Sequence, residues 1–351
     1  MHKLILLAGL CAIITGMSAT KRLVCHYDSA SVQNRGPGHF KISDIDPTLC
    51  SHLVYSFVAI DNFGKLGIIP GDIPQFYAFN ALKNSNPQLK TLLEVNLMLN
   101  FPALHTMIST PNGRSSFIGS AIDAVQEYGF DGLNVFWMNR MNYPTLNPQL
   151  FSELIMELRA AFEGLLLTAS ISAVESVIDG SYDVHTIANN VDFLNVMTAG
   201  IDINFMSQPS DTGFERTISA AAYLASNGAP QNKLNLGIAA YGRAFAETLG
   251  LSEPDKTKPL QGYLTDRPGL WTYYEVCHHL SESTSQIANA FVGYDSLPTI
   301  VAKADFINNH AGGAFVMSIN LDDFSGNYCG LGNYPVIQTL HDELTTLPAS
   351  R

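Results

Sequence analysis

The chain is 351 residues long, with 46% apolar residues, 14% charged residues and a formal net charge of −12. A chain so rich in apolar side chains and so poor in charge is expected to fold around a large core, because disordered chains show the opposite balance. An acidic surface repels phosphate backbones and anionic lipids. We therefore exclude nucleic acid as a partner and general electrostatic docking on a membrane.

The N-terminus has the pattern of a secretory signal. Lys3 provides a positive start, the run Leu4–Ile14 is apolar, and small residues follow it. This run is too short to span a membrane and is typical of a signal peptide. We predict a signal peptide over residues 1–19, one barrel domain over 20–351 and a secreted, extracellular protein. No membrane insertion is expected, since no later stretch is long and apolar enough.

Eight short apolar runs recur along the rest of the chain. They are Leu23–Tyr27, Leu53–Ile60, Lys90–Val95, Gly132–Trp137, Leu165–Ile171, Phe193–Met197, Leu234–Ala239 and Gly313–Ile319. Such runs fit strands that are buried on both faces of a parallel sheet. Stretches with helical spacing lie between the runs, over residues 115–128, 148–162, 211–225 and 297–309.

The alternation of strands and helices predicts an α/β fold, a (β/α)8 TIM barrel. The alternative is an open, doubly wound sheet, which would need a glycine-rich phosphate turn after the first strand. One interval breaks the rhythm: residues 244–270 are polar and contain several prolines and glycines. We predict a short insertion there, after strand seven, on the face where barrels keep their sites.

The cysteines fit an exported protein. Four remain once Cys11 leaves with the signal peptide, namely Cys25, Cys50, Cys277 and Cys329. They allow three pairings. Their spacing favours Cys25–Cys50 and Cys277–Cys329, because closing a shorter loop loses less chain entropy. No CxxC, HxxxH or HExxH motif is present, so we predict no metal site and no cofactor.

The segment Phe130–Met138, FDGLNVFWM, resembles the fourth strand of the glycoside hydrolase family 18 chitinases, whose motif is DGxDxDWE. Further segments agree in order and spacing: VCHY at 24–27, SHLVYSF at 51–57, KTLL at 90–93, NVMT at 195–198, GI at 237–238, YGR at 241–243, YYEVC at 273–277, GGA at 312–314 and LDDF at 321–324. The resemblance covers roughly the whole mature chain. It implies the barrel fold, hydrolysis of β-1,4-linked N-acetylglucosamine and disulfides at both proposed pairs.

The resemblance assigns catalysis to the tip of this fourth strand. There a glutamic acid protonates the leaving oxygen, and an aspartate two residues earlier orients the substrate acetamide. In this chain the two positions are Met138 and Phe136, and Asn134 replaces a deeper aspartate. A thioether and a phenyl ring have no transferable proton. We therefore predict no catalytic residue and no enzyme activity; an active chitinase would need an unusual acid, and Glu94 would lie too deep.

A ligand groove is predicted at the barrel mouth. Its candidate residues are Tyr27, Phe57, Glu94, Met98, Met138, Met197, Tyr241 and Met317. We expect the methionines to fill the mouth, the alternative being a site for an apolar ligand. We also expect Glu94 to accept a hydrogen bond from the Asn134 amide, since a buried carboxylate needs partners.

Sugar binding in chitinase-like lectins depends on exposed tryptophans, and alternation along the strand turns Trp137 toward the helices. The function that we predict is a secreted, inactive chitinase-like protein that acts as an extracellular binding or signalling and immune factor. The alternative is a lectin with weak affinity for chitooligosaccharides through Tyr27, Phe57 and Tyr241. The partner is then a weakly bound chitin oligosaccharide or an unidentified extracellular protein.

Overall fold

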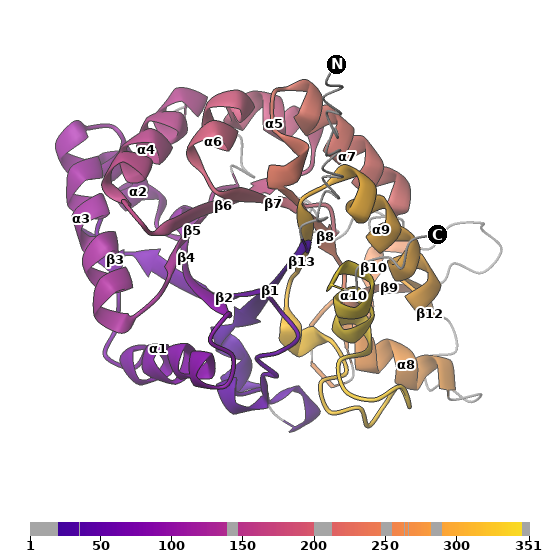
Figure 1. The fold of residues 1–351 in the computed structure, drawn as a ribbon. Coiled ribbons are helices and arrows are strands. Elements are labelled where there is room, and N and C mark those ends of the chain that lie inside the picture. Colours follow the sequence, from indigo (N-terminus) through magenta and orange to yellow (C-terminus); the bar gives the residue numbers. More distant parts are fainter. Residues whose placement is uncertain are drawn as a thin grey trace, which may run out of the picture.

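The protein is described by a computed structural model that covers residues 20–34, 36–138, 147–199, 213–246, 255–262, 264–265, 267–281 and 290–345. Within these ranges, eight parallel strands close into a barrel, because β1 pairs with both β2 and β13. Figure 1 shows the strands as a ring with helices around it. The barrel strands, in spatial order, are β1 (Arg22–Asp28), β2 (His52–Ile60), β4 (Lys90–Asn96), β5 (Gly132–Phe136), β6 (Leu166–Ser172), β7 (Phe193–Met197), β8 (Leu234–Ile238) and β13 (Gly313–Val316).

The predicted (β/α)8 barrel is confirmed, and each predicted apolar run contains one of these strands or most of it. The runs are continuous because both faces of the sheet are covered. In β5, Leu133 and Val135 pack outward into the main core, while Asn134 and Phe136 face the barrel interior. All five residues of this strand are buried.

The helices cover the outside of the ring and begin and end at the expected signals (Figure 1). The Thr110 hydroxyl accepts a hydrogen bond from the Gly113 amide at the start of α3, and Gly129 ends it with φ 77°. The helices are α1 (Ile73–Asn80), α2 (Phe101–Ile108), α3 (Pro111–Tyr128), α4 (Pro148–Ala161), α5 (Glu175–Ser181), α6 (Val184–Asn190), α7 (Phe214–Ser226), α8 (Tyr273–Ser281), α9 (Leu297–His310) and α10 (Pro335–Thr345).

A second, antiparallel sheet follows β8. Its central strand β9 (Tyr241–Ala246) pairs with β10 (Asp255–Pro259), β11 (Leu270–Thr272) and β12 (Ala290–Tyr294), and α8 comes between β11 and β12. The described part of the segment 244–270, which we predicted as the insertion, includes the end of β9, all of β10 and the start of β11. The sheet extends further along the chain, since β12 pairs with most of β9. A short strand, β3 (Leu66–Gly67), extends β2 in antiparallel fashion.

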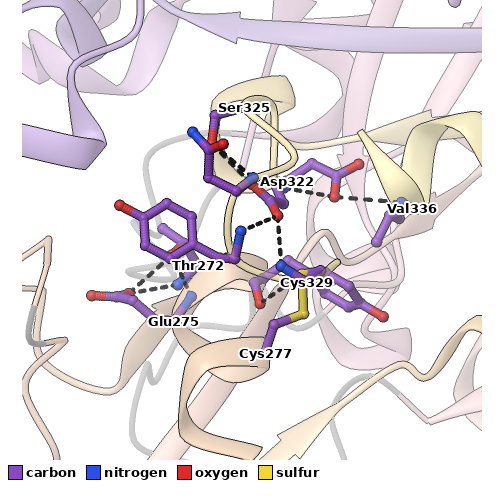
Figure 2. The surroundings of a disulfide bond; sticks show 11 residues. Thr272, Glu275, Cys277, Asp322, Ser325, Cys329 and Val336 are labelled. Atoms are coloured by element: carbon purple, nitrogen blue, oxygen red, sulfur yellow. Dashed lines mark hydrogen bonds between the residues drawn. A yellow bond between two sulfur atoms is a disulfide. The ribbon is translucent and has the colours of Figure 1, made fainter. Parts of the chain in front are cut away.

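Two disulfides join the pairs that the spacing favoured. Cys25–Cys50 links β1 to the loop before β2, with a Cα–Cα distance of 6.1 Å. Cys277–Cys329 links α8 to the loop after β13, with a Cα–Cα distance of 5.0 Å (Figure 2). In that loop, Asp323 accepts a 2.8 Å hydrogen bond from the Cys329 amide. The disulfide therefore holds the second sheet against the end of the barrel.

Residues around this bridge are architectural. Figure 2 shows Asp322 beside Val336, whose amide donates to the Asp322 carboxylate at 3.4 Å. The Ile337 amide donates to the same carboxylate at 2.9 Å, so Asp322 caps the start of α10. None of the helices in the described ranges is long and apolar enough to cross a membrane. The predicted signal peptide over 1–19 lies outside the described residues.

Candidate binding site at the barrel mouth

The tip of β5 presents no ionisable group to the barrel mouth. Phe136 and Met138 are buried in an apolar cluster inside the barrel, where they are 7% and 3% exposed. Trp137, between them, points outward and stacks on Phe151 of α4 with a centroid distance of 4.6 Å and an interplanar angle of 11°. The alternation that we assumed for this strand is therefore the one that the structure has.

A cavity of about 440 Å³ lies at the carboxyl ends of the barrel strands. Its lining is mostly apolar and comes from β1, β2, β4, β5, β9 and β11 and from neighbouring loops, including the one after β13. The lining residues are His26, Asp28, Ser56, Phe57, Glu94, Asn96, Met98, Leu99, Phe136, Met138, Tyr241, Arg243, Arg267, Leu270, Met317, Ser318 and Leu321. Cavities of this size are typical of sites for small molecules.

The structure brings most of the predicted groove together. Phe57, Glu94, Met98, Met138, Tyr241 and Met317 all line this cavity. We expected methionines to fill the mouth: Met138 is buried in the apolar cluster and Met317 packs against it, while a cavity remains beside Met98, Met138 and Met317. Met197 does not line the cavity; it packs in the apolar cluster inside the barrel with Phe193 and Phe315. Methionine there fills volume, as in an ordinary core.

Tyr27 is the predicted groove residue that the structure places elsewhere. It is 1% exposed and lies on the outer face of β1, stacked on Phe79 with a centroid distance of 5.7 Å. Successive side chains of a strand point to opposite faces, so the inward neighbours on β1 are His26 and Asp28. Sequence reasoning selected the aromatic residue and missed these two, although alternation from Cys25 would have found them.

Glu94 lies in the barrel interior with both carboxylate oxygens occupied. The Ser56 hydroxyl donates to Oε1 at 2.6 Å, and the Asn134 amide donates to Oε2 at 2.6 Å. The predicted hydrogen bond between Glu94 and Asn134 is therefore present. Burial raises the pKa of Glu94 to about 7, although these two hydrogen bonds act against that rise.

Polar residues continue from Asn134 through the barrel interior. Its carbonyl oxygen accepts from the Thr168 hydroxyl at 2.7 Å. The Asn195 amide donates to Asn134 at 3.4 Å, and the Asn235 amide donates to Asn195 at 3.1 Å. Arg22 donates to Asn235 at 3.0 Å. We call Arg22, Ser56, Glu94, Asn134, Thr168, Asn195 and Asn235 the interior network. Its satisfied hydrogen bonds explain how a barrel interior can hold so many polar groups.

His26 completes the polar floor of the cavity. Its Nδ1 lies 3.2 Å from the Ser56 hydroxyl oxygen and 3.4 Å from Glu94 Oε2. The ring is fully buried, and burial lowers the pKa of His26 to about 3. The imidazole is therefore neutral at physiological pH. At the rim, Arg267 pairs with Asp28 at 3.3 Å.

Few aromatic faces are available to stack on a sugar. Both tryptophans of the chain are buried, Trp137 at 1% and Trp271 at 0% exposed. Tyr241 is 1% exposed, and its hydroxyl donates to the Ala199 carbonyl. Phe57 lines the cavity and is 42% exposed. Among the cavity's aromatic residues it offers the most open face.

The tip of β5 carries no group suited to acid–base catalysis. The position nearest the mouth on β5 carries a thioether, which neither donates nor accepts a proton in acid–base catalysis. Glu94, the carboxylate in contact with the cavity floor, already accepts two hydrogen bonds from neighbouring side chains. No cluster of three metal-ligating side chains occurs in the parts of the chain that the structure describes.

Comparison with known proteins places this arrangement in a family. Residues 22–322 match the family described as glycosyl hydrolases family 18. The chain is 32% identical to human chitinase-3-like protein 2 over 378 residues, which covers 95% of each chain.

Two solved structures have the same fold. The Group IV chitinase of Ostrinia furnacalis is 31% identical, with a TM-score of 0.82 over 93% of this chain and all of that one. Human YKL-39, described as a pseudo-chitinase with retained chitooligosaccharide binding, is 30% identical, with a TM-score of 0.81 over the same shares. The chain therefore belongs to glycosyl hydrolases family 18.

Proposed function

We propose that this protein has no glycosidase activity and acts by binding a ligand in the cavity at its barrel mouth. The observation that carries the proposal is Met138, which occupies the position that the family motif gives to the acid and borders the cavity. Phe136 likewise occupies the motif position of the aspartate that orients the substrate. Without a proton donor beside the glycosidic oxygen, the leaving group departs unprotonated, which is slow by several orders of magnitude.

Among the described residues at the cavity floor, Glu94 is the carboxyl group that could compete for the role of acid. Its pKa of about 7 suits a general acid. Its geometry does not, because the side chain is fully buried and both oxygens accept hydrogen bonds at 2.6 Å from Ser56 and Asn134. A substrate oxygen would have to displace one of these partners. We therefore assign Glu94 to the interior network.

A fluorogenic chitobioside assay tests the absence of activity. Purified protein, at concentrations a thousandfold above those used for an active chitinase, is assayed from pH 4 to pH 8. We expect no release of fluorophore above the buffer rate at any pH. Release that follows the protein through two chromatographic steps would overturn the proposal.

A second candidate function is weak binding of chitooligosaccharides. It is supported by the exposed ring of Phe57 at the cavity and by the retained binding described for human YKL-39. The buried positions of Tyr27, Trp137 and Trp271 argue that such binding is weak, because ring stacking supplies much of the affinity for sugars. Calorimetric titration with the N-acetylglucosamine tetramer measures it, and Phe57→Ala is the variant that should abolish it.

We also propose that the protein is secreted and works outside the cell as a binding or signalling factor. Two disulfides support export, since such bridges persist in oxidising compartments. Expression of the full chain and of a chain without residues 1–19 in eukaryotic cells tests this. The full chain should accumulate in the medium and the shortened one should not.

A further inference from the structure

One side chain in the cavity lining, His26, has a ring nitrogen without a partner among the described residues. Within the described part of the chain, His26 Nε2 is buried and has no hydrogen-bond partner. The ring of His26 lines the cavity. Buried polar atoms in folded proteins nearly always have partners, so an exception at a cavity wall indicates a position that a ligand satisfies.

The neighbours of His26 determine which kind of ligand atom fits. Ser56 has a single hydroxyl proton, and it donates that proton to Glu94 Oε1 at 2.6 Å. At the 3.2 Å contact between Ser56 and His26 Nδ1, the serine oxygen must then be the acceptor. Nδ1 therefore carries the ring proton. Nε2 is left with its lone pair and can only accept a hydrogen bond.

The other charged groups around the cavity have partners. Glu94 accepts from Ser56 and Asn134, and Asp28 pairs with Arg267 at the rim. Arg243, which also lines the cavity, is 1% exposed and engaged within the protein. Much of the remaining wall is apolar, from the side chains of Phe57, Met98, Leu99, Phe136, Met138 and Met317. A wall of this composition matches a ligand with a large apolar surface and a single group that donates a hydrogen bond.

We propose that the cavity binds a neutral, mostly apolar small molecule whose one hydroxyl group donates a hydrogen bond to His26 Nε2. The inference rests on the proposed function, in that the cavity binds rather than hydrolyses, and it names the chemical class of the ligand. A volume of about 440 Å³ holds a molecule the size of two or three fused rings with a short substituent.

A pyranose ring fits this wall less well than such a ligand. Each N-acetylglucosamine unit carries several hydroxyl groups and an amide, and each of them loses hydrogen bonds to water when it is buried. Methionine and phenylalanine side chains cannot replace those bonds. They do form adaptable contacts with apolar ligands.

Two probes that differ in one hydrogen-bond donor test the inference. 1-Naphthalenemethanol has a hydroxyl group, and its methyl ether has the same ring system without a donor. Binding is measured by calorimetry on the full chain at pH 8, above the pKa of Glu94. We expect the alcohol to bind at least five times more tightly than the ether. Equal affinities, a tighter ether, or no binding of the alcohol would overturn the inference, and this comparison needs no variant.

Two variants test whether His26 Nε2 accepts the hydrogen bond from the hydroxyl group of the alcohol. His26→Phe keeps a ring in the cavity wall but removes Nε2, so the preference for the alcohol should disappear while the ether binds as before. His52→Phe is the matched control. It removes a second imidazole from the same barrel, at the start of β2, where His52 packs on Phe193 and lies outside the cavity lining. It should keep the preference. A preference that survives in His26→Phe would contradict the assignment.

The outcomes separate this inference from the proposed function. Cleavage of the chitobioside would overturn the absence of activity, whatever the probes show. An inactive protein that binds neither probe would leave the proposed function standing and overturn the ligand class. A competition experiment tests whether the cavity prefers sugars. If the N-acetylglucosamine tetramer displaces the alcohol at equal concentration, the inference is wrong.

Discussion

The barrel interior has two regions of opposite character. Deeper in the barrel, the interior network joins side chains from seven strands, and its oxygens and amides are matched by partners within 3.4 Å. At the mouth, the ends of β5 and β13 place Phe136, Met138 and Met317 beside the cavity. The polar groups of the network have partners, whereas the tip of β5, where a hydrolase of this family needs an unpaired acid, is apolar. Polar residues inside this barrel therefore support the fold, whereas a hydrolase also needs one that takes part in the reaction.

The largest effect should come from breaking the interior network at Asn134. Asn134→Leu leaves Glu94 Oε2 and the Thr168 hydroxyl buried without this partner. We expect the free energy of unfolding to fall by about 3–5 kcal/mol, the usual cost of removing one partner of a buried charged group. Urea denaturation followed by circular dichroism measures it. A loss below about 1 kcal/mol would mean that the network does not support the barrel.

The next effect concerns pH. Burial raises the pKa of Glu94 from 4.5 to about 7. Between these values the unfolded chain loses the proton before the folded one, so the contribution of Glu94 to stability is full below pH 4.5 and is lost as pH rises through 7. Glu94→Gln should therefore gain stability relative to the original protein across this interval, on the order of a few kcal/mol.

Thermal unfolding of both proteins at pH 5 and pH 8 measures this difference. Comparing the stabilities of the two proteins cancels the contributions of the other titrating groups. Among these is Asp322, whose pKa is also raised by burial to about 7. A difference in stability that stays constant between the two pH values would contradict the raised pKa of Glu94.

A smaller loss in the free energy of unfolding is expected when a carboxyl group replaces the Met138 side chain. Met138→Glu places a carboxylate among apolar side chains. We expect a loss of about 2 kcal/mol at pH 8 and a smaller loss at pH 5, where the new group holds its proton more easily. The matched control is Met138→Leu, which conserves volume and should cost less than about 1.5 kcal/mol. If the glutamate variant were as stable as the leucine variant at pH 8, the mouth would not be the apolar region described above.

The smallest effect on stability should come from Phe57. Its ring is 42% exposed, so Phe57→Ala should change the free energy of unfolding by less than about 1 kcal/mol. The same variant should remove any calorimetric signal for the N-acetylglucosamine tetramer. Binding that persists unchanged in the variant would show that sugars contact another surface.

The fold could be predicted because it depends on patterns that are local in the sequence. The run Leu53–Ile60 reads as a strand from its composition alone, and β2 is His52–Ile60. The bond between Glu94 and Asn134 also followed from alternation on two neighbouring strands, which pair in register at these residues. The limits of the second sheet could not be predicted, because the pairing of β12 with β9 joins segments that are far apart in the sequence.

The site was harder to predict because it depends on side-chain packing. Tyr27 was assigned to the mouth for its chemistry, whereas its position on β1 turns it outward against Phe79. The methionines were expected to close the mouth. Whether Met98 and Met317 fill a space or border it depends on rotamers and on the loops above the barrel, which no pattern in the sequence specifies. His26 was missed because its importance comes from one unsatisfied atom.

The central claim is that the described tip of β5 has no side chain that can protonate a glycosidic bond, and the fate of a natural substrate tests it most directly. The N-acetylglucosamine tetramer is incubated for days with the protein and, in parallel, with Glu94→Gln, and the products are read by mass spectrometry. We predict an intact tetramer in both samples. Shorter oligomers that form with the original protein and not with Glu94→Gln would contradict the claim and identify Glu94 as the acid.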